Sequence, residues 1–335
     1  MASAIGSDRA LPWTWRVSPA ALIVSLPVVI AGVVAAAPLA VSIGAVLVCA
    51  GPHNLQEARY FLRRLPARLG RLRAFFAVGC CGTAVLAAGF ITLVWATRTG
   101  RVAGEASSVA LAAWETTLIA WMATLVWLRG RTPPRWRCSW LVPTALVAVA
   151  AAWAAPAVFS VALVYLHPLL AILFLDRELL RQRSPWRMAV RRAAWMVPPC
   201  IVGLLVVAHA LPPLVGDGLV SRQIEAHVGG GVVPLVGLRG LVTVHAFLEL
   251  LHYAVWIVAI PAAALPASWH LDAAPLARRS PAWRLGLRTV SLVGGLLVIG
   301  LWAWFAADYA VARDVYFTVA ILHVLAEFPM LLRTA

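Results

Sequence analysis

Residues 241–260 read LVTVHAFLELLHYAVWIVAI, and this stretch decides the fold class. It is a predominantly apolar run of 20 residues, which is the length that an α-helix needs to cross the hydrocarbon core of a bilayer. Its three ionisable side chains are His245, Glu249 and His252. Spacings of four and seven residues place them on one face of a helix. The stretch therefore predicts a membrane helix that carries a polar stripe.

The whole chain has the composition of such helices. Of its 335 residues, 62% are hydrophobic and only 12% are charged, which excludes an ordinary soluble domain. We therefore predict an all-α, polytopic integral membrane helix bundle that forms a single transmembrane domain over residues 1–335. About ten helices are expected, or eight if one of the two hairpins, which are interrupted near Pro38 and Pro156, does not span. The predicted spans are 19–37, 39–60, 74–96, 108–128, 139–155, 157–175, 193–215, 239–264, 286–307 and 315–333.

Charge predicts the orientation of these spans. All 28 basic residues are arginine, and the formal net charge is +15. The arginines gather in alternate loops, whereas the loops between them are nearly charge-balanced. Because arginine-rich loops stay on the cytoplasmic side, both termini are expected in the cytoplasm, and the charge indicates orientation rather than a nucleic-acid partner. No cleavable signal peptide is expected, because the first apolar stretch is too long for one. The arginine-rich segments are 59–73, 129–137, 177–192 and 278–288.

One pattern recurs three times in apolar surroundings: a histidine followed four residues later by a glutamate. On a helix each pair presents an imidazole and a carboxylate on one face. Ionisable groups at membrane depth are costly and usually functional, so the repetition indicates a buried polar site. The pairs are His53 with Glu57, His245 with Glu249, and His323 with Glu327.

Two more histidines, His167 and His252, lie within predicted spans. The four helices that carry these histidines and the three pairs are all expected to run inward from the outer surface, so the imidazoles could share one level. For a single histidine, a hydrogen bond between helices would be the better explanation. For four helices with such residues at comparable depth, a metal or catalytic site is the better explanation. The predicted metal ligands are His53, His167, His245, His252 and His323.

The glutamates Glu57, Glu249 and Glu327 are expected to act at this site as ligands, as catalytic groups or as partners that orient the imidazoles. Imidazole with carboxylate favours iron(II), with zinc or copper as alternatives and heme as a less favoured one. A lipophilic substrate would reach the site from the bilayer. The competing hypothesis is a proton- or ion-coupled transporter in which the same residues form a relay.

Other polar residues are expected to be less informative. His209 falls toward the outer end of its helix, and His227 and His270 are expected in solvated loops. Glu115 lies well inside the fourth span, where a ligand partner, a proton relay and a carboxylate hydrogen-bonded to threonines are rated equally. Asp176 and Glu178 stand among arginines, and local ion pairing explains them.

Two short motifs resemble a known family. GPHNLQEA at residues 51–58 resembles the Pro-His-Gly-x-x-Asp-Ala signature of the bacterial Brp/Blh carotene-cleaving dioxygenases, with Asn54 in place of glycine and Glu57 in place of aspartate. LHVLAEF at residues 322–328 is similar to the late Pro-His-x-x-x-Asp element of that family. The resemblance implies a multi-pass enzyme of the bacterial cytoplasmic membrane that uses iron(II) and O₂ to cleave a carotenoid. Its partners would be membrane lipids and that lipophilic substrate; no oligomeric state is implied.

Overall fold

The computed structural model describes residues 19–131, 138–214, 218–233, 236–263 and 271–334, and it confirms the all-α membrane bundle. Within these ranges, eight helices are long and apolar enough to cross a membrane. Each of the ten predicted spans corresponds to a helical segment, but two of these are shorter than the rest. The long helices are α2 (Pro38–Arg64), α3 (Arg73–Arg98), α4 (Glu105–Gly130), α6 (Pro156–Arg181), α7 with α8 (Arg187–Trp195 and Val197–Ala210), α10 with its continuation (Gly237–Ala263), α12 (Pro281–Ala307) and α13 (Tyr309–Thr334).

The two shorter apolar helices are α1 (Pro19–Ala36) and α5 (Leu141–Ala154). Each is followed by a single linking alanine and a proline that opens the next long helix. The links adopt nearly the same backbone conformation, with φ −150° and ψ 66° at Ala37 and φ −154° and ψ 74° at Ala155. A proline disfavours the α conformation in the residue before it. The two helix breaks therefore lie directly before Pro38 and Pro156, as predicted.

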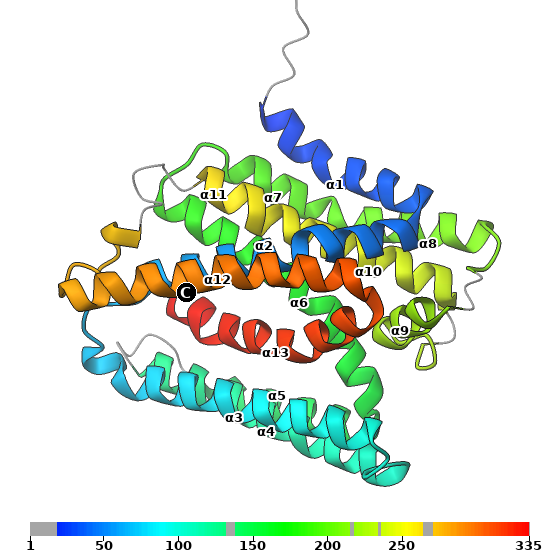
Figure 1. Ribbon diagram of the computed structural model, residues 1–335, viewed down its shortest axis with the longest axis horizontal. Coiled ribbons are helices and arrows are strands. Elements are labelled where there is room, and N and C mark those ends of the chain that lie inside the picture. Colours follow the sequence, from blue (N-terminus) through cyan, green and yellow to red (C-terminus); the bar gives the residue numbers. More distant parts are fainter. Residues whose placement is uncertain (1–18, 132–137, 215–217, 234–235, 264–270, 335) are drawn as a thin grey trace, which may run out of the picture.

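Helix α10 (Gly237–Ala254) is the centre of the bundle. In its most apolar window 78% of the residues are buried, against 11–39% for the other long helices. It packs against α1, α2, α6, α8 and the short helix α9 (Leu219–Val228). Figure 1 shows α3, α4 and α5 as a separate layer beneath α13. A helix that is covered on all sides can hold polar groups away from lipid, which makes α10 the expected wall of a buried site.

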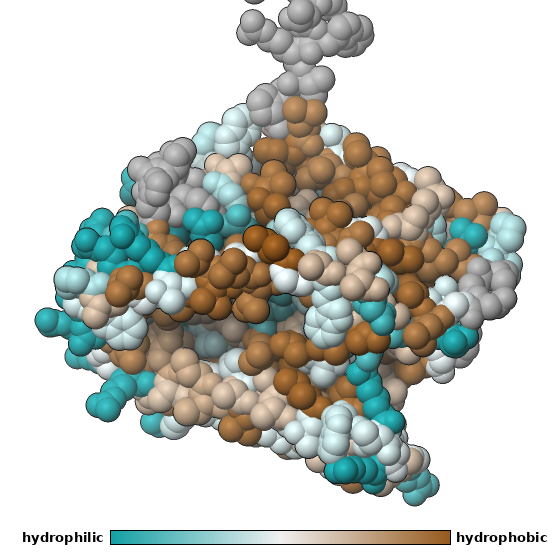
Figure 2. Space-filling model, viewed as in Figure 1, coloured by the Kyte–Doolittle hydropathy of each residue, from teal (hydrophilic) through white to brown (hydrophobic). Residues whose placement is uncertain are grey.

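The surface has the two-zone pattern of a membrane protein. Figure 2 shows hydrophobic residues over the middle of this face and hydrophilic residues gathered toward its left end and lower right. Large apolar side chains such as Leu297 and Val147, which are 68% and 70% exposed, point outward from α12 and α5. Exposed apolar area on this scale is typical of contact with lipid rather than water.

Candidate metal centre

Four helices bring four histidine rings together in the interior. His53 comes from α2, His167 from α6, His252 from α10 and His323 from α13. The centroid of the His53 ring lies 5.3 Å from those of both His252 and His323. The His167 centroid lies 4.8 Å from that of His252 and 5.2 Å from that of His323. Residues up to 270 positions apart in the sequence thus surround one small volume.

The nitrogens and carboxylate oxygens of this cluster form two overlapping groups that could hold a metal ion. In each group the possible ligand atoms lie within 4.8 Å of one another. Only His252 belongs to both. The first group contains His53, Glu57, His252 and His323, and the second contains His167, His252 and Glu327.

Backbone carbonyls orient two of the rings. His53 Nδ1 lies 3.1 Å from the carbonyl oxygen of Cys49, and His252 Nδ1 lies 3.3 Å from that of Pro168. A carbonyl oxygen can only accept, so Nδ1 is the protonated nitrogen in each ring and Nε2 carries the lone pair. This is the usual arrangement around a metal-binding histidine. Because His252 offers one nitrogen, it can serve only one of the two groups at a time.

Two carboxylates complete the cluster. Both oxygens of Glu57 are buried and have no hydrogen-bond partner among the described residues, and the same holds for Nε2 of His252. Oε2 of Glu327 lies 3.0 Å from Nδ1 of His167, and the Glu327 side chain is completely buried. An unpartnered carboxylate inside a membrane is costly, and a cation would offset that cost. The residues therefore fit a metal ion.

Irregular helix geometry accompanies the cluster. Pro52 precedes His53 and cannot donate to the carbonyl of Val48, and the indole Nε1 of Trp302 donates to that carbonyl instead, at 3.3 Å. On α10, a π-helical segment, η4 (Val255–Ala259), begins three residues after His252. Such segments are frequent at functional sites.

The cluster is not equally buried on all sides. The side chains of His53 and His252 are buried, whereas that of His167 is 16% exposed and that of His323 is partly exposed. His167 and His323 lie on α6 and α13, which are in contact. The side of the cluster between these two helices is therefore the most accessible one.

His245 and Glu249 are not part of either group, although both were predicted to act at the same site. His245 lies seven residues before His252, which is ~10 Å along a helix axis, and a single metal site is only about 5 Å across. Nδ1 of His245 lies 3.9 Å from Oε2 of Glu249, and the hydroxyl of Tyr253 donates to Oε1 of Glu249 at 2.9 Å. The Tyr253 ring lies 4.5 Å from that of His53.

Sequence reasoning missed Tyr253, which connects Glu249 to the cluster. Its only signal is its position four residues after a glutamate within a membrane helix. The position of His227 also differs from the prediction of a solvated loop. It lies on α9 with its ring 5.0 Å from that of His245 and 4.2 Å from that of Phe317. Burial, with added repulsion from His245 and Arg313, lowers the pKa of His227 well below its usual range.

The remaining polar residues lie apart from the cluster. His209 is exposed near the end of α8, as predicted, and His270 lies outside the described residues. Glu115 is buried on α4, where it accepts a hydrogen bond of 2.6 Å from Ser160 Oγ. Of its three predicted roles, this contact favours a hydrogen-bonded carboxylate, but its partner is Ser160 rather than the predicted threonines, since Thr116 and Thr117 donate to backbone carbonyls.

Comparison with protein-family models, curated proteins and solved structures finds no match for this chain. The fold and the composition define a class of protein: this chain is a multi-pass membrane protein whose interior contains a His/Glu cluster.

Proposed function

We propose that this protein is a metal-dependent oxygenase or oxidoreductase of the membrane, with non-heme iron as the metal and a lipophilic molecule as the substrate. The observation that carries the proposal is the meeting of four imidazoles from α2, α6, α10 and α13 beside the buried carboxylate of Glu57, which has no hydrogen-bond partner among the described residues. Histidine with carboxylate is the donor set of non-heme iron(II) enzymes. The resemblance of the two histidine motifs to the Brp/Blh dioxygenases supports a carotenoid as the substrate.

Each residue has a role in this proposal. Nε2 of His53 and of His252 would bind the ion, since their Nδ1 atoms face carbonyls. His323 and Glu57 would complete the set around the ion. Glu327 would hold the ring of His167 in place and take up its proton, because the two groups are 3.0 Å apart. A ferrous ion bound there supplies the redox chemistry for a reaction with O₂.

The surroundings suit an apolar substrate. The site lies among helices with lipid-facing apolar side chains, so a substrate dissolved in the bilayer needs no aqueous channel. The partly exposed His167 and His323 indicate that it would approach between α6 and α13. Exclusion of water by the bundle would protect reactive species from hydrolysis.

Elemental analysis of protein purified without oxygen tests this proposal. We expect about one iron per chain, with loss in the variants His53→Ala and His323→Ala. The matched control is His209→Ala, which removes an exposed histidine outside the cluster and should keep the metal. Folded protein without any transition metal would contradict the proposal. A heme would be detected in the same sample by its Soret absorbance.

A proton relay is the second candidate, and a chain of polar groups favours it. The chain runs from His227 on α9 through His245, Glu249 and Tyr253 to His53, with successive ring or atom separations of 5.0, 3.9, 2.9 and 4.5 Å. A coupled transporter would need such a path at membrane depth. The relay hypothesis predicts that a pH gradient drives proton movement in vesicles without any metal. Glu249→Gln should abolish this movement. Transport insensitive to that substitution would exclude this candidate.

A further inference from the structure

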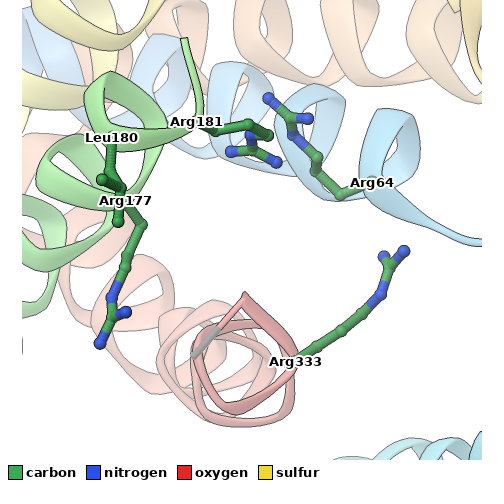
Figure 3. A pocket seen from close by; sticks show the side chains of 5 residues that line it. All are labelled: Arg64, Arg177, Leu180, Arg181 and Arg333. Carbon is green, nitrogen blue, oxygen red and sulfur yellow. The ribbon is translucent and has the colours of Figure 1, made fainter. Parts of the chain in front are cut away.

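A second site lies at the end of the bundle where α2, α6 and α13 finish. It is an open cavity of about 310 Å³, and its lining is dominated by arginine. Figure 3 shows the guanidinium groups placed around the opening, with contributions from all three helices. The lining residues are Arg64, Arg177, Leu180, Arg181 and Arg333.

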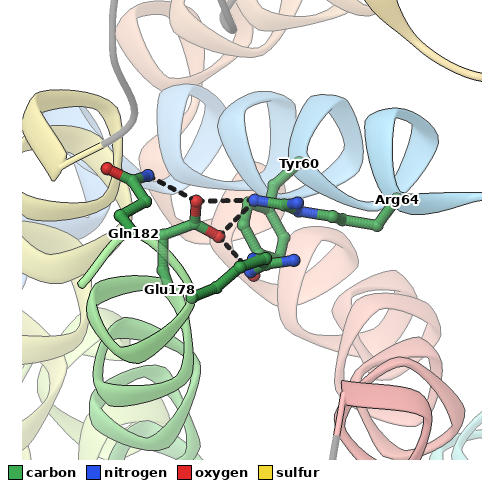
Figure 4. A network of polar contacts seen from close by, with 5 residues as sticks. Tyr60, Arg64, Glu178 and Gln182 are labelled. Atoms are coloured by element: carbon green, nitrogen blue, oxygen red, sulfur yellow. Dashed lines mark hydrogen bonds and ion pairs between the residues drawn. The ribbon is translucent and has the colours of Figure 1, made fainter.

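The cavity keeps an excess of positive charge. Glu178 pairs with two of these arginines, Arg64 and Arg181. Figure 4 shows this contact, in which Gln182 Nε2 also donates to Glu178 at 2.6 Å. The neighbouring Asp176 is held by other arginines, Arg187 and Arg191. The Glu178 carboxylate therefore pairs with two of the four guanidinium groups that line the cavity.

Two of these arginines have buried donors without an acceptor. Nε of Arg64 and Nη1 of Arg333 are shielded from solvent and have no hydrogen-bond partner among the described residues. Leaving a buried guanidinium N–H without an acceptor is unfavourable. Because solvent does not reach these two donors, an anion in the cavity would contact other guanidinium nitrogens of the lining.

The cavity is separate from the His/Glu cluster. His53, His167 and His323 lie 10–14 residues before the arginines of the same helices, which is ~15–21 Å along the axes. The three helices therefore run in the same direction, because their histidines meet at one level and their arginines at another. Between the levels lies a packed aromatic layer of Tyr60, Phe61, Phe174 and Trp256.

The aromatic layer also fixes the inner side of the cavity. The guanidinium of Arg64 lies over the Tyr60 ring, 5.2 Å from its centroid, and Arg181 donates to the Tyr60 hydroxyl at 3.3 Å. Two of the four arginines are thus held in position before any ligand arrives. Such preorganisation reduces the entropy lost on binding.

We propose that this cavity binds the phosphate group of an anionic membrane phospholipid. Guanidinium groups match phosphate oxygens in a bidentate way, and three helices place four of them around one volume. The cavity lies at the ends of apolar helices, where lipid headgroups are found, and the adjoining Leu180 is 44% exposed and offers an apolar contact for an acyl chain. Basic pockets between membrane helices are known to bind such headgroups. The same guanidinium groups could also recognise the oxygens of free inorganic phosphate.

Lipid binding to the full chain in detergent tests the proposal. Phosphatidylglycerol should bind saturably and raise the melting temperature, whereas phosphatidylcholine should not. Arg177→Gln and Arg333→Gln should each weaken phosphatidylglycerol binding about tenfold, since each removes a charge-assisted contact. The matched control is Arg284→Gln, which removes an exposed arginine of α12 outside the cavity and should leave binding unchanged.

Inorganic phosphate, with chloride at equal ionic strength as a reference, distinguishes the two sources. Phosphatidylglycerol binding that phosphate displaces only weakly supports a lipid headgroup. Tight binding of phosphate alone, weakened by the same two substitutions, would overturn the lipid as the ligand and assign the cavity to free phosphate. Equal binding of both lipids, or an equal loss in Arg284→Gln, would overturn the site itself. Arg177 is exposed, so its substitution tests the site even if Arg333→Gln does not fold.

Discussion

Nδ1 of His167 lies 3.0 Å from Oε2 of Glu327, although the two residues are 160 positions apart on α6 and α13. Glu327 is completely buried, whereas the His167 side chain is 16% exposed. The pair joins the two helices at the level of the His/Glu cluster. The Glu327 carboxylate also fixes the orientation of the His167 imidazole.

Substitution of Glu327 should weaken metal binding without unfolding the protein. Glu327→Gln keeps the size of the side chain but removes the negative charge beside His167. The His167 ring packs against those of the proposed ligands His252 and His323. Loss of a polar partner next to the ligands typically lowers metal affinity 10–100-fold. Titration of the metal-free protein with iron(II) measures this. Glu225→Gln, an exposed change on α9, is the control and should retain the original affinity.

His245→Ala should leave the metal content unchanged. This histidine was predicted to be a ligand, but it lies outside both groups of possible ligand atoms. Its nearest partners are Glu249 and His227, which form the polar chain toward α9. The iron content of His245→Ala is to be compared with that of His53→Ala. An equal loss in both variants would show that the cluster extends further along α10 than the distances indicate.

Packing between α3 and α4 should depend on Gly82. A Cβ atom at this position would overlap the indole of Trp121, whose Nε1 donates to the carbonyl of Val78 at 2.9 Å. Gly82→Ala should therefore destabilise the bundle by about 1–3 kcal/mol, the usual cost of overpacking. Gly295→Ala on α12 has open space around it and should cost little. Thermal unfolding in detergent compares the two; equal melting temperatures would contradict this packing.

The fold was largely predictable from the sequence because apolar length and proline positions are local properties. The breaks at Ala37 and Ala155 lie at residues that precede a proline, which disfavours the α conformation there. The predicted loop that contains His227 was wrong, because helix α9 forms there. Its polar sequence does not identify a helix that packs against α10 and α13.

The site was predictable in part. Helical periodicity places His245, Glu249 and His252 on one face, but it does not say how far along the axis a partner helix presents its own histidines. His252 lies at the level of the other histidines and belongs to the cluster. His245 lies seven residues before it on the same face and does not belong to the cluster. The contact of Glu178 with Arg64 was missed for a similar reason. Arginines close in sequence explain the charge of Glu178, whereas Arg64 lies 114 positions away.

The most direct test of the central claim is X-ray absorption at the edge of the metal that copurifies with the protein. A metal held by the cluster should show nitrogen and oxygen neighbours at ~2.1 Å, with the outer-shell scattering of several imidazoles. The imidazole contribution should fall in His252→Ala, which removes the ring that both groups share. A spectrum without imidazole neighbours, or one that is identical in His252→Ala, would contradict the account.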